Sequence, residues 1–192
     1  MKMRASPRRG HRLTVELGPG DEVLPSLPEV ALKRILVATD FSAPSRKAVR
    51  YAASFAKQFG AEILLLHVVE PIPPPPPAVG LILPESLDVD MREEAATHLA
   101  KWRERLSGIR VKANVRVGAP YHEIITAAEE TNTDLIIIAT HGHSRLAQMF
   151  IGSTAERVVR HATCPVLVVR EHEHDFVSPA RAKTKARRSK GE

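Results

Sequence analysis

Runs of apolar residues alternate with helix-like patterns over residues 33–171 of this chain. Five segments are rich in small and branched apolar residues, namely 34–40, 62–70, 109–117, 134–139 and 164–170. In the stretches between them, apolar residues recur every three or four positions, a spacing typical of amphipathic helices. Pro44 lies near the start of the first such stretch and Gly60 at its end, as expected at helix boundaries. The pattern predicts five strands joined by four helices.

The order of these elements indicates a parallel sheet. Helical connections return the chain to the same end of the sheet, so that successive strands run in one direction. Nearly continuous apolar runs are expected for strands covered on both faces, whereas residues 109–117 alternate as in a half-exposed edge strand. We therefore expect a single α/β domain with a doubly wound, five-stranded parallel sheet and helices on both faces. With strand order 3-2-1-4-5, its ligand crevice lies beyond the first and fourth strands.

The two ends of the chain differ from this region in charge. The 192 residues carry a net charge of +6, but residues 13–175 hold 17 basic and 21 acidic side chains. The excess of Lys and Arg is therefore located at the ends. We expect residues 1–32 to form a flexible N-terminal extension, 33–171 to form the folded domain, and 172–192 to be a disordered basic tail. Nucleic acid would then bind only weakly, through the tails.

Cysteine content and hydropathy predict a cytoplasmic protein. Cys164 is the only cysteine, so an internal disulfide is impossible, and its position before Pro165 indicates a structural role. No apolar run has the length of a membrane span, and the N-terminus lacks the apolar core of a secretory signal. The proline run Pro71–Pro77 predicts a polyproline II segment, as a spacer or a docking motif.

Small and polar residues gather after the first and fourth predicted strands, in residues 38–45 and 139–144. A second feature is Gly152-Ser153-Thr154, which opens the following helix. The free N–H groups and positive end of a helix suit a phosphate. The alternative is a capping box, in which Ser153 and Glu156 satisfy the helix end themselves.

Other candidate residues have structural alternatives. Asp40 either caps the helix near Pro44 or accepts hydrogen bonds from a ribose or a base. We expect His67 to be a core histidine. His141-Gly142-His143 lacks the spacing of the nucleotidyltransferase signature, and Leu146 replaces the second glycine of a hydrolase nucleophile elbow.

The sequence does not contain a Walker P-loop or a G-x-G-x-x-G turn. The histidines near residues 141–143 and 171–175 form only weak candidates for a metal site. Asp40 is the only well-placed carboxylate, so we assign neither catalytic nor metal-binding residues.

Several segments, in one order, resemble the universal stress protein family. They are ILVATDFS at 35–42, LLLHVVE at 64–70 and HATCPVLVVR at 161–170. The nucleotide-binding subset of that family carries the pattern G-2x-G-9x-G-[ST]. Gly142, Gly152 and Ser153 match its later part, whereas Ala139 occupies the place of its first glycine. A close main-chain approach survives this change unless the position needs a positive φ.

The resemblance implies an adenine nucleotide alpha hydrolase-like fold that binds ATP, or AMP or ADP, with Mg²⁺ accompanying the nucleotide. Asp40 would lie against the ribose or base with Ala38 beside it, and the main chain of Val68 would meet the adenine edge. The residues around the phosphates would be Ala139, Gly142, His143, Gly152, Ser153 and Thr154. The family also implies a homodimer through the fifth strand, Val166 to Val169.

Three functions compete on these observations. The first is a nucleotide-binding module that acts in the stress response by ligand-dependent association. The second is a slow ATP hydrolase, for which the sequence offers no convincing general base. The third is an interaction protein that binds no nucleotide and uses the proline run and the basic tails. We favour them in this order.

Overall fold

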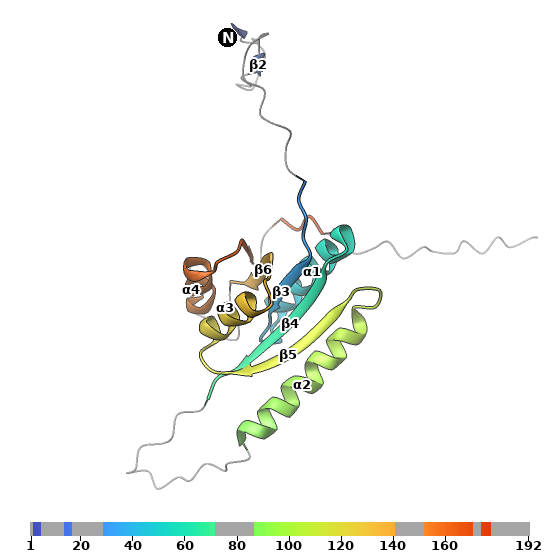
Figure 1. Ribbon diagram of the computed structural model, residues 1–192, viewed down its shortest axis with the longest axis vertical. Helices are drawn as coiled ribbons and strands as arrows, with labels where there is room; N and C mark the ends of the chain where they lie inside the picture. The colour runs from blue at the N-terminus through green and yellow to red at the C-terminus, as the bar shows by residue number, and fades with distance from the viewer. Residues whose placement is uncertain are drawn as a thin grey trace, which may run out of the picture. The chain divides into compact units, whose positions relative to one another are not determined.

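The computed structural model describes residues 2–4, 14–16, 29–71, 87–140, 152–170 and 174–177 (Figure 1). The chain divides into two compact units, Met1–Ala31 and Leu32–Glu192. In the first unit, β1 (Lys2–Arg4) pairs antiparallel with β2 (Thr14–Glu16). Sequence analysis did not predict this pair, because three-residue strands are too short to show a two-residue period.

The second unit contains a parallel sheet of five strands. They are β3 (Arg34–Ala38), β4 (Glu62–Val69), β5 (Val111–Val117), β6 (Leu135–Ala139) and β7 (Val166–Val169). Their order is β5-β4-β3-β6-β7, and every neighbouring pair is parallel. This is the order 3-2-1-4-5 in terms of the five sheet strands, so the predicted fold class is confirmed. β5 lies at an edge, as its alternating pattern predicted.

The four helices among the described residues cover the two faces of this sheet (Figure 1). α1 (Ala43–Phe59) and α2 (Leu87–Arg105) contribute to one buried cluster, whereas α3 (Pro120–Glu130) and α4 (Ser153–His161) contribute to the other. None of the helices in the described part of the chain is long and apolar enough to span a membrane.

The central strand β3 shows why its sequence is continuously apolar. Ile35 and Val37 belong to the cluster under α1 and α2, and Leu36 belongs to the cluster under α3 and α4. All three side chains are fully buried. Burial of such a side chain contributes about 1.5–3 kcal/mol, so both faces of β3 stabilise the sheet.

The boundaries of α1 follow from local chemistry. The Oγ of Ser42, the N-cap residue, accepts a hydrogen bond of 3.3 Å from the N–H of Ser45. Gly60 ends the helix in a left-handed conformation, with φ 69°, and its N–H donates to the carbonyl of Ala56. Ser42 rather than Asp40 is therefore the cap of α1. Of the proline run, residues from 72 onward lie outside the described part of the chain.

Candidate functional site: a pocket at the carboxyl ends of the strands

A pocket of about 320 Å³ lies at the carboxyl ends of β3, β4 and β6. The first turns of α3 and α4 complete its wall. This is where strand order reverses in a doubly wound sheet. Seven of the nine residues predicted for the site line the pocket, namely Ala38, Asp40, Val68, Ala139, Gly152, Ser153 and Thr154. The other two, Gly142 and His143, lie outside the described residues.

The loop between β3 and α1 is built around Thr39, which is buried. Its N–H donates to the carbonyl of Leu66 at 2.9 Å, which joins the loop to β4. Its hydroxyl contacts the Ser45 hydroxyl at 3.0 Å and accepts the N–H of Phe41 at 3.0 Å. These hydrogen bonds tie the loop to β4 and to the start of α1 next to the pocket.

Asp40 lines the pocket from this loop. Its Oδ1 accepts a hydrogen bond of 3.1 Å from the N–H of Ser42, a local turn of the kind that aspartate favours. The alternative in which Asp40 caps α1 is wrong, because Ser42 occupies the cap position. A carboxylate has further acceptor positions, so Asp40 can also accept hydrogen bonds from a ligand.

The start of α4 differs from the capping box that the sequence allowed. Gly152 is the N-cap residue, with φ −57°, and the helix has no side-chain cap hydrogen bond. Ser153 is therefore the first helical residue, and its side chain is exposed. Glu156 Oε1 instead accepts a hydrogen bond of 2.8 Å from Arg160. The N-terminus of α4 thus keeps its positive end directed at the pocket, which is favourable for an anion.

Ala139 is the last residue of β6 and lies in the pocket wall. Among the described residues other than glycine, only Phe41 and Asn132 have a positive φ. The backbone at Ala139 therefore does not require glycine, and alanine fits the strand conformation.

His67 was expected to be a core histidine, and the structure corrects this. Its side chain is half-buried in β4 and lines the pocket. Nδ1 lies 2.8 Å from the carbonyl oxygen of Thr39, so this nitrogen carries the proton. His67 thereby ties β4 to the loop that holds Asp40.

The sequence analysis did not find the part of the wall that comes from the β5–α3 connection. Pro120 and Ile124 of α3 line the pocket, and Glu70 lines it at the end of β4. The Gly-Ala-Pro turn after the third sheet strand could have indicated this part of the wall. The carboxyl ends of all strands in a parallel sheet lie at the same edge, so this turn is next to the crevice.

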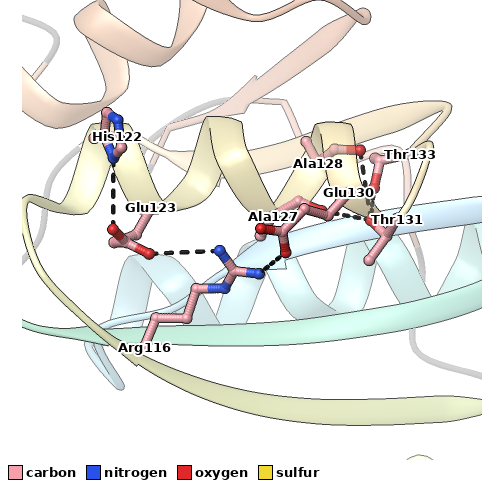
Figure 2. A network of polar contacts seen from close by, with 8 residues as sticks. All are labelled: Arg116, His122, Glu123, Ala127, Ala128, Glu130, Thr131 and Thr133. Atoms are coloured by element: carbon pink, nitrogen blue, oxygen red, sulfur yellow. Dashed lines mark hydrogen bonds and ion pairs between the residues drawn. The ribbon is translucent and has the colours of Figure 1, made fainter.

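Helix α3 is held by Arg116 of β5, which lies between one carboxylate in the first turn of the helix and another at its end (Figure 2). Its guanidinium pairs with Glu123 at 3.5 Å and also with Glu130. Gly118 leaves room for this contact, because a Cβ there would lie 2.9 Å from Glu123 Oε1. The ion pairs hold the helix that carries Pro120 and Ile124 against the sheet.

The pocket combines groups of opposite polarity. Two carboxylates, Asp40 and Glu70, share it with the positive end of α4. Within the described residues, no group of three His, Cys, Asp or Glu side chains could hold a metal ion. Burial raises the pKa of the Cys164 thiol, which favours its protonated form.

Comparison with known proteins identifies the family. The model of the universal stress protein family matches residues 31–170. The chain belongs to this family. A universal stress protein of Methanocaldococcus jannaschii is 35% identical over 144 residues, which cover 72% of this chain and 82% of that protein.

Solved structures of universal stress proteins share the fold. UspA from Lactobacillus plantarum is 27% identical, with a TM-score of 0.65, and the match covers 74% of this chain and all of that one. A universal stress protein solved in complex with cAMP is 22% identical, with a TM-score of 0.55, and the match covers 73% of this chain and 98% of that one. Members of the family therefore have the same sheet as the protein described here.

Proposed function

We propose that the pocket binds an adenine nucleotide, with ATP as the principal ligand and ADP or AMP as alternatives. The observation that carries this proposal is the meeting of two complementary groups in one pocket. The uncapped N-terminus of α4 can bind phosphate through the main-chain N–H groups of Ser153 and Thr154, next to Gly152 in the pocket wall. The carboxylate of Asp40 can accept hydrogen bonds from the hydroxyls of a ribose.

The remaining wall suits a purine base. Val68 offers main-chain N–H and C=O groups at the end of β4, while Ala38 and Ile124 supply apolar surface. A volume of about 320 Å³ falls in the range of small-molecule pockets. The universal stress protein solved with cAMP has an adenine nucleotide bound, but at 22% identity it supports the fold only. The proposal therefore rests on the pocket of this chain.

Calorimetric titration with ATP, ADP and AMP tests the proposal. We expect Asp40→Asn to weaken binding about tenfold, because a hydrogen bond to a charged group is lost. Glu104→Gln, on the exposed side of α2, is the matched control and should leave the affinity unchanged. If ATP at about 1 mM, the weakest affinity of interest, gives neither heat nor a thermal shift, the proposal fails.

We further propose that Mg²⁺ enters with the nucleotide phosphates rather than at a site of its own. Mg²⁺ is commonly bound through phosphates with one or two carboxylates. A repeat of the ATP titration in EDTA should then weaken binding of ATP more than binding of AMP, which has a single phosphate. Equal affinities with and without the chelator would contradict this step.

The cellular role that follows is a cytoplasmic stress-response module that associates in a ligand-dependent way. We propose a homodimer through β7 (Val166–Val169), which pairs with β6 on one side only among the described strands. An apolar edge strand of this kind favours pairing with another chain. Analytical ultracentrifugation with and without ATP tests it, and a monomer under both conditions would overturn it.

A further inference from the structure

Phe41, the residue after Asp40, has a left-handed backbone conformation with φ 65°. This conformation is unfavourable for a bulky residue, because its Cβ approaches a neighbouring carbonyl oxygen. In the described part of the chain, the other non-glycine residue with a positive φ is Asn132, a type that tolerates it. Contacts from the surrounding structure must therefore hold Phe41 in this conformation.

Three aromatic rings supply these contacts. The ring of His67 stacks on that of Phe41, with centroids 4.6 Å apart and planes inclined by 29°. His98 and Trp102 of α2 meet the same ring edge-on, at 5.0 and 5.5 Å. Stacked and edge-on pairs of this geometry are favourable beyond the area they bury. The Phe41 side chain is thus fixed by β4 and α2, which lie outside its own loop.

The backbone of Phe41 is bonded on both sides. Its N–H donates to Thr39 Oγ1 at 3.0 Å, and its carbonyl accepts Arg46 Nη1 at 2.8 Å. Thr39 and Asp40, the two residues before it, both line the pocket, as does His67. Phe41 is not among the described residues that line the pocket. Phe41 therefore adjoins three polar wall residues and is not itself part of the described wall.

We propose that Phe41 is a positioning residue for the nucleotide. Its ring, held by His67 and α2, fixes the left-handed turn that presents Asp40 to the ligand. The inference rests on the proposed function and adds to it a residue that acts through Asp40 and His67. It also brings α2 into the site, although no described residue of that helix lines the pocket. Packing of α2 and affinity for the nucleotide should therefore change together.

The test compares Phe41→Ala with Phe55→Ala. Phe55 is a matched control, because its ring is also partly buried against the same cluster and stacks on another ring, Phe59, at 6.3 Å. We expect Phe41→Ala to bind ATP about tenfold more weakly, the effect of misplacing one hydrogen bond to a charged group. Phe55→Ala should lower the melting temperature while its affinity stays within about twofold of the wild type. Equal affinities of the two variants would overturn the proposal.

Phe41→Gly separates the ring from the backbone strain. Glycine adopts a positive φ without penalty but supplies no ring. We expect this variant to bind as weakly as Phe41→Ala, and wild-type affinity would overturn the role of the ring. If the alanine variant fails to fold, Phe41→Leu and Phe55→Leu, which keep apolar volume, replace the first pair.

Amide hydrogen exchange of the ligand-free protein gives a second measurement. Phe41→Ala should speed exchange of the N–H groups of residues 39–42, and Phe55→Ala should not. Hydrogen exchange without ligand tests the positioning role of Phe41 separately from nucleotide binding. Absence of ATP binding by the wild type would refute the proposed function, and unchanged exchange in Phe41→Ala would refute the positioning role of Phe41 with or without nucleotide.

Discussion

The main-chain N–H of Gly152 donates a hydrogen bond of 2.6 Å to the carbonyl oxygen of Thr140. Thr140 directly follows β6 and Gly152 directly precedes α4, so this bond joins the end of a central strand to the start of a helix. Thr140 is also tied to β7, because its N–H donates to the carbonyl of Val169 at 3.0 Å. The end of β6 and the start of α4, where we expect the phosphate contacts, are therefore held next to each other.

Substitution of Gly152 by valine should abolish nucleotide binding and leave the fold intact. At φ −57° a residue with a side chain is sterically allowed, so the effect would come from a branched side chain at the pocket wall. We expect affinity to fall by at least about a hundredfold, as when a phosphate contact at a helix end is blocked. Titration calorimetry and circular dichroism measure the two effects.

Gly108→Ala is a control that should lower stability and leave the affinity for ATP unchanged. Gly108 follows α2 and does not line the pocket, and its backbone has φ 79° with open space around it. Alanine in this left-handed conformation costs roughly 1–2 kcal/mol of stability. This variant should melt at a lower temperature and bind ATP normally. Weak binding by Gly108→Ala would show that affinity in this protein follows overall stability, against our expectation.

Restoration of glycine at position 139 should change little. Ala139 lies in the strand conformation of β6 without a positive φ, so glycine is not required there. We expect Ala139→Gly to alter ATP affinity by less than about threefold and to lower stability slightly, since glycine weakens a strand by roughly 0.5–1 kcal/mol. A much tighter complex would mean that the alanine methyl group obstructs the phosphate.

The fold was predictable because its strongest signal is local. Short continuous apolar runs such as 35–38 are typical of strands buried on both faces, and the helices between them favour parallel pairing. The site was predictable in part because Asp40 and Gly152 stand next to such elements. The cap at Ser42 is a local contact with Ser45, and a serine ahead of the helix was an available signal for it. The role of His67 and the left-handed Phe41 were not predictable, because each depends on contacts between segments far apart in the sequence, which residue spacing does not reveal.

Loss of the Arg116 side chain should destabilise α3. Its partner Glu123 is largely shielded, with 21% side-chain exposure, so the pair is screened less than one on the open surface. We expect Arg116→Met to cost about 1 kcal/mol and to lower the melting temperature by about 2–4 °C. ATP affinity should fall as well, because Pro120 and Ile124 of α3 line the pocket.

Lys112→Met is the control for this prediction. Lys112 lies on the same strand and pairs with Glu62 at 3.2 Å, but its side chain is 70% exposed. Removal of such a pair typically changes stability by less than about 0.5 kcal/mol. Differential scanning calorimetry at low and high salt distinguishes the two variants. Equal and small effects would show that the Arg116 ion pairs do not anchor α3.

Cys164 should react slowly with thiol reagents in the native protein. Burial raises the pKa of its thiol, and the nearby Asp134 acts in the same direction. The thiolate is the reactive form, so its population at neutral pH is reduced. Because the chain has a single cysteine, labelling with a chromogenic disulfide reports on this thiol alone. Labelling in urea should be faster, and equal rates in native and denatured protein would contradict the prediction.

The described segment after β7, residues 174–177, packs against α1. The ring of Phe176 meets that of Tyr51 edge-on at 4.8 Å, and Asp175 lies 3.7 Å from the guanidinium of Arg50. The N–H of Val177 donates to Asp175 Oδ1 at 3.0 Å. This hydrogen bond, with the Tyr51 hydroxyl and the nearby cations, holds the pKa of Asp175 below its ordinary value of 3.8.

Docking of this segment should therefore weaken in acid. The lowered pKa means that docking favours the ionised carboxylate of Asp175. The stabilisation that Asp175 gives to docking is therefore complete above pH 3.8 and disappears as the pH falls through the docked-state pKa. Carbon-detected NMR titration of Asp175 measures this value directly. Phe176→Ala, which removes the ring contact with Tyr51, should return the pKa toward 3.8, whereas Phe59→Ala at the other end of α1 should not. A wild-type pKa at or above 3.8 would show that the segment is not docked in solution.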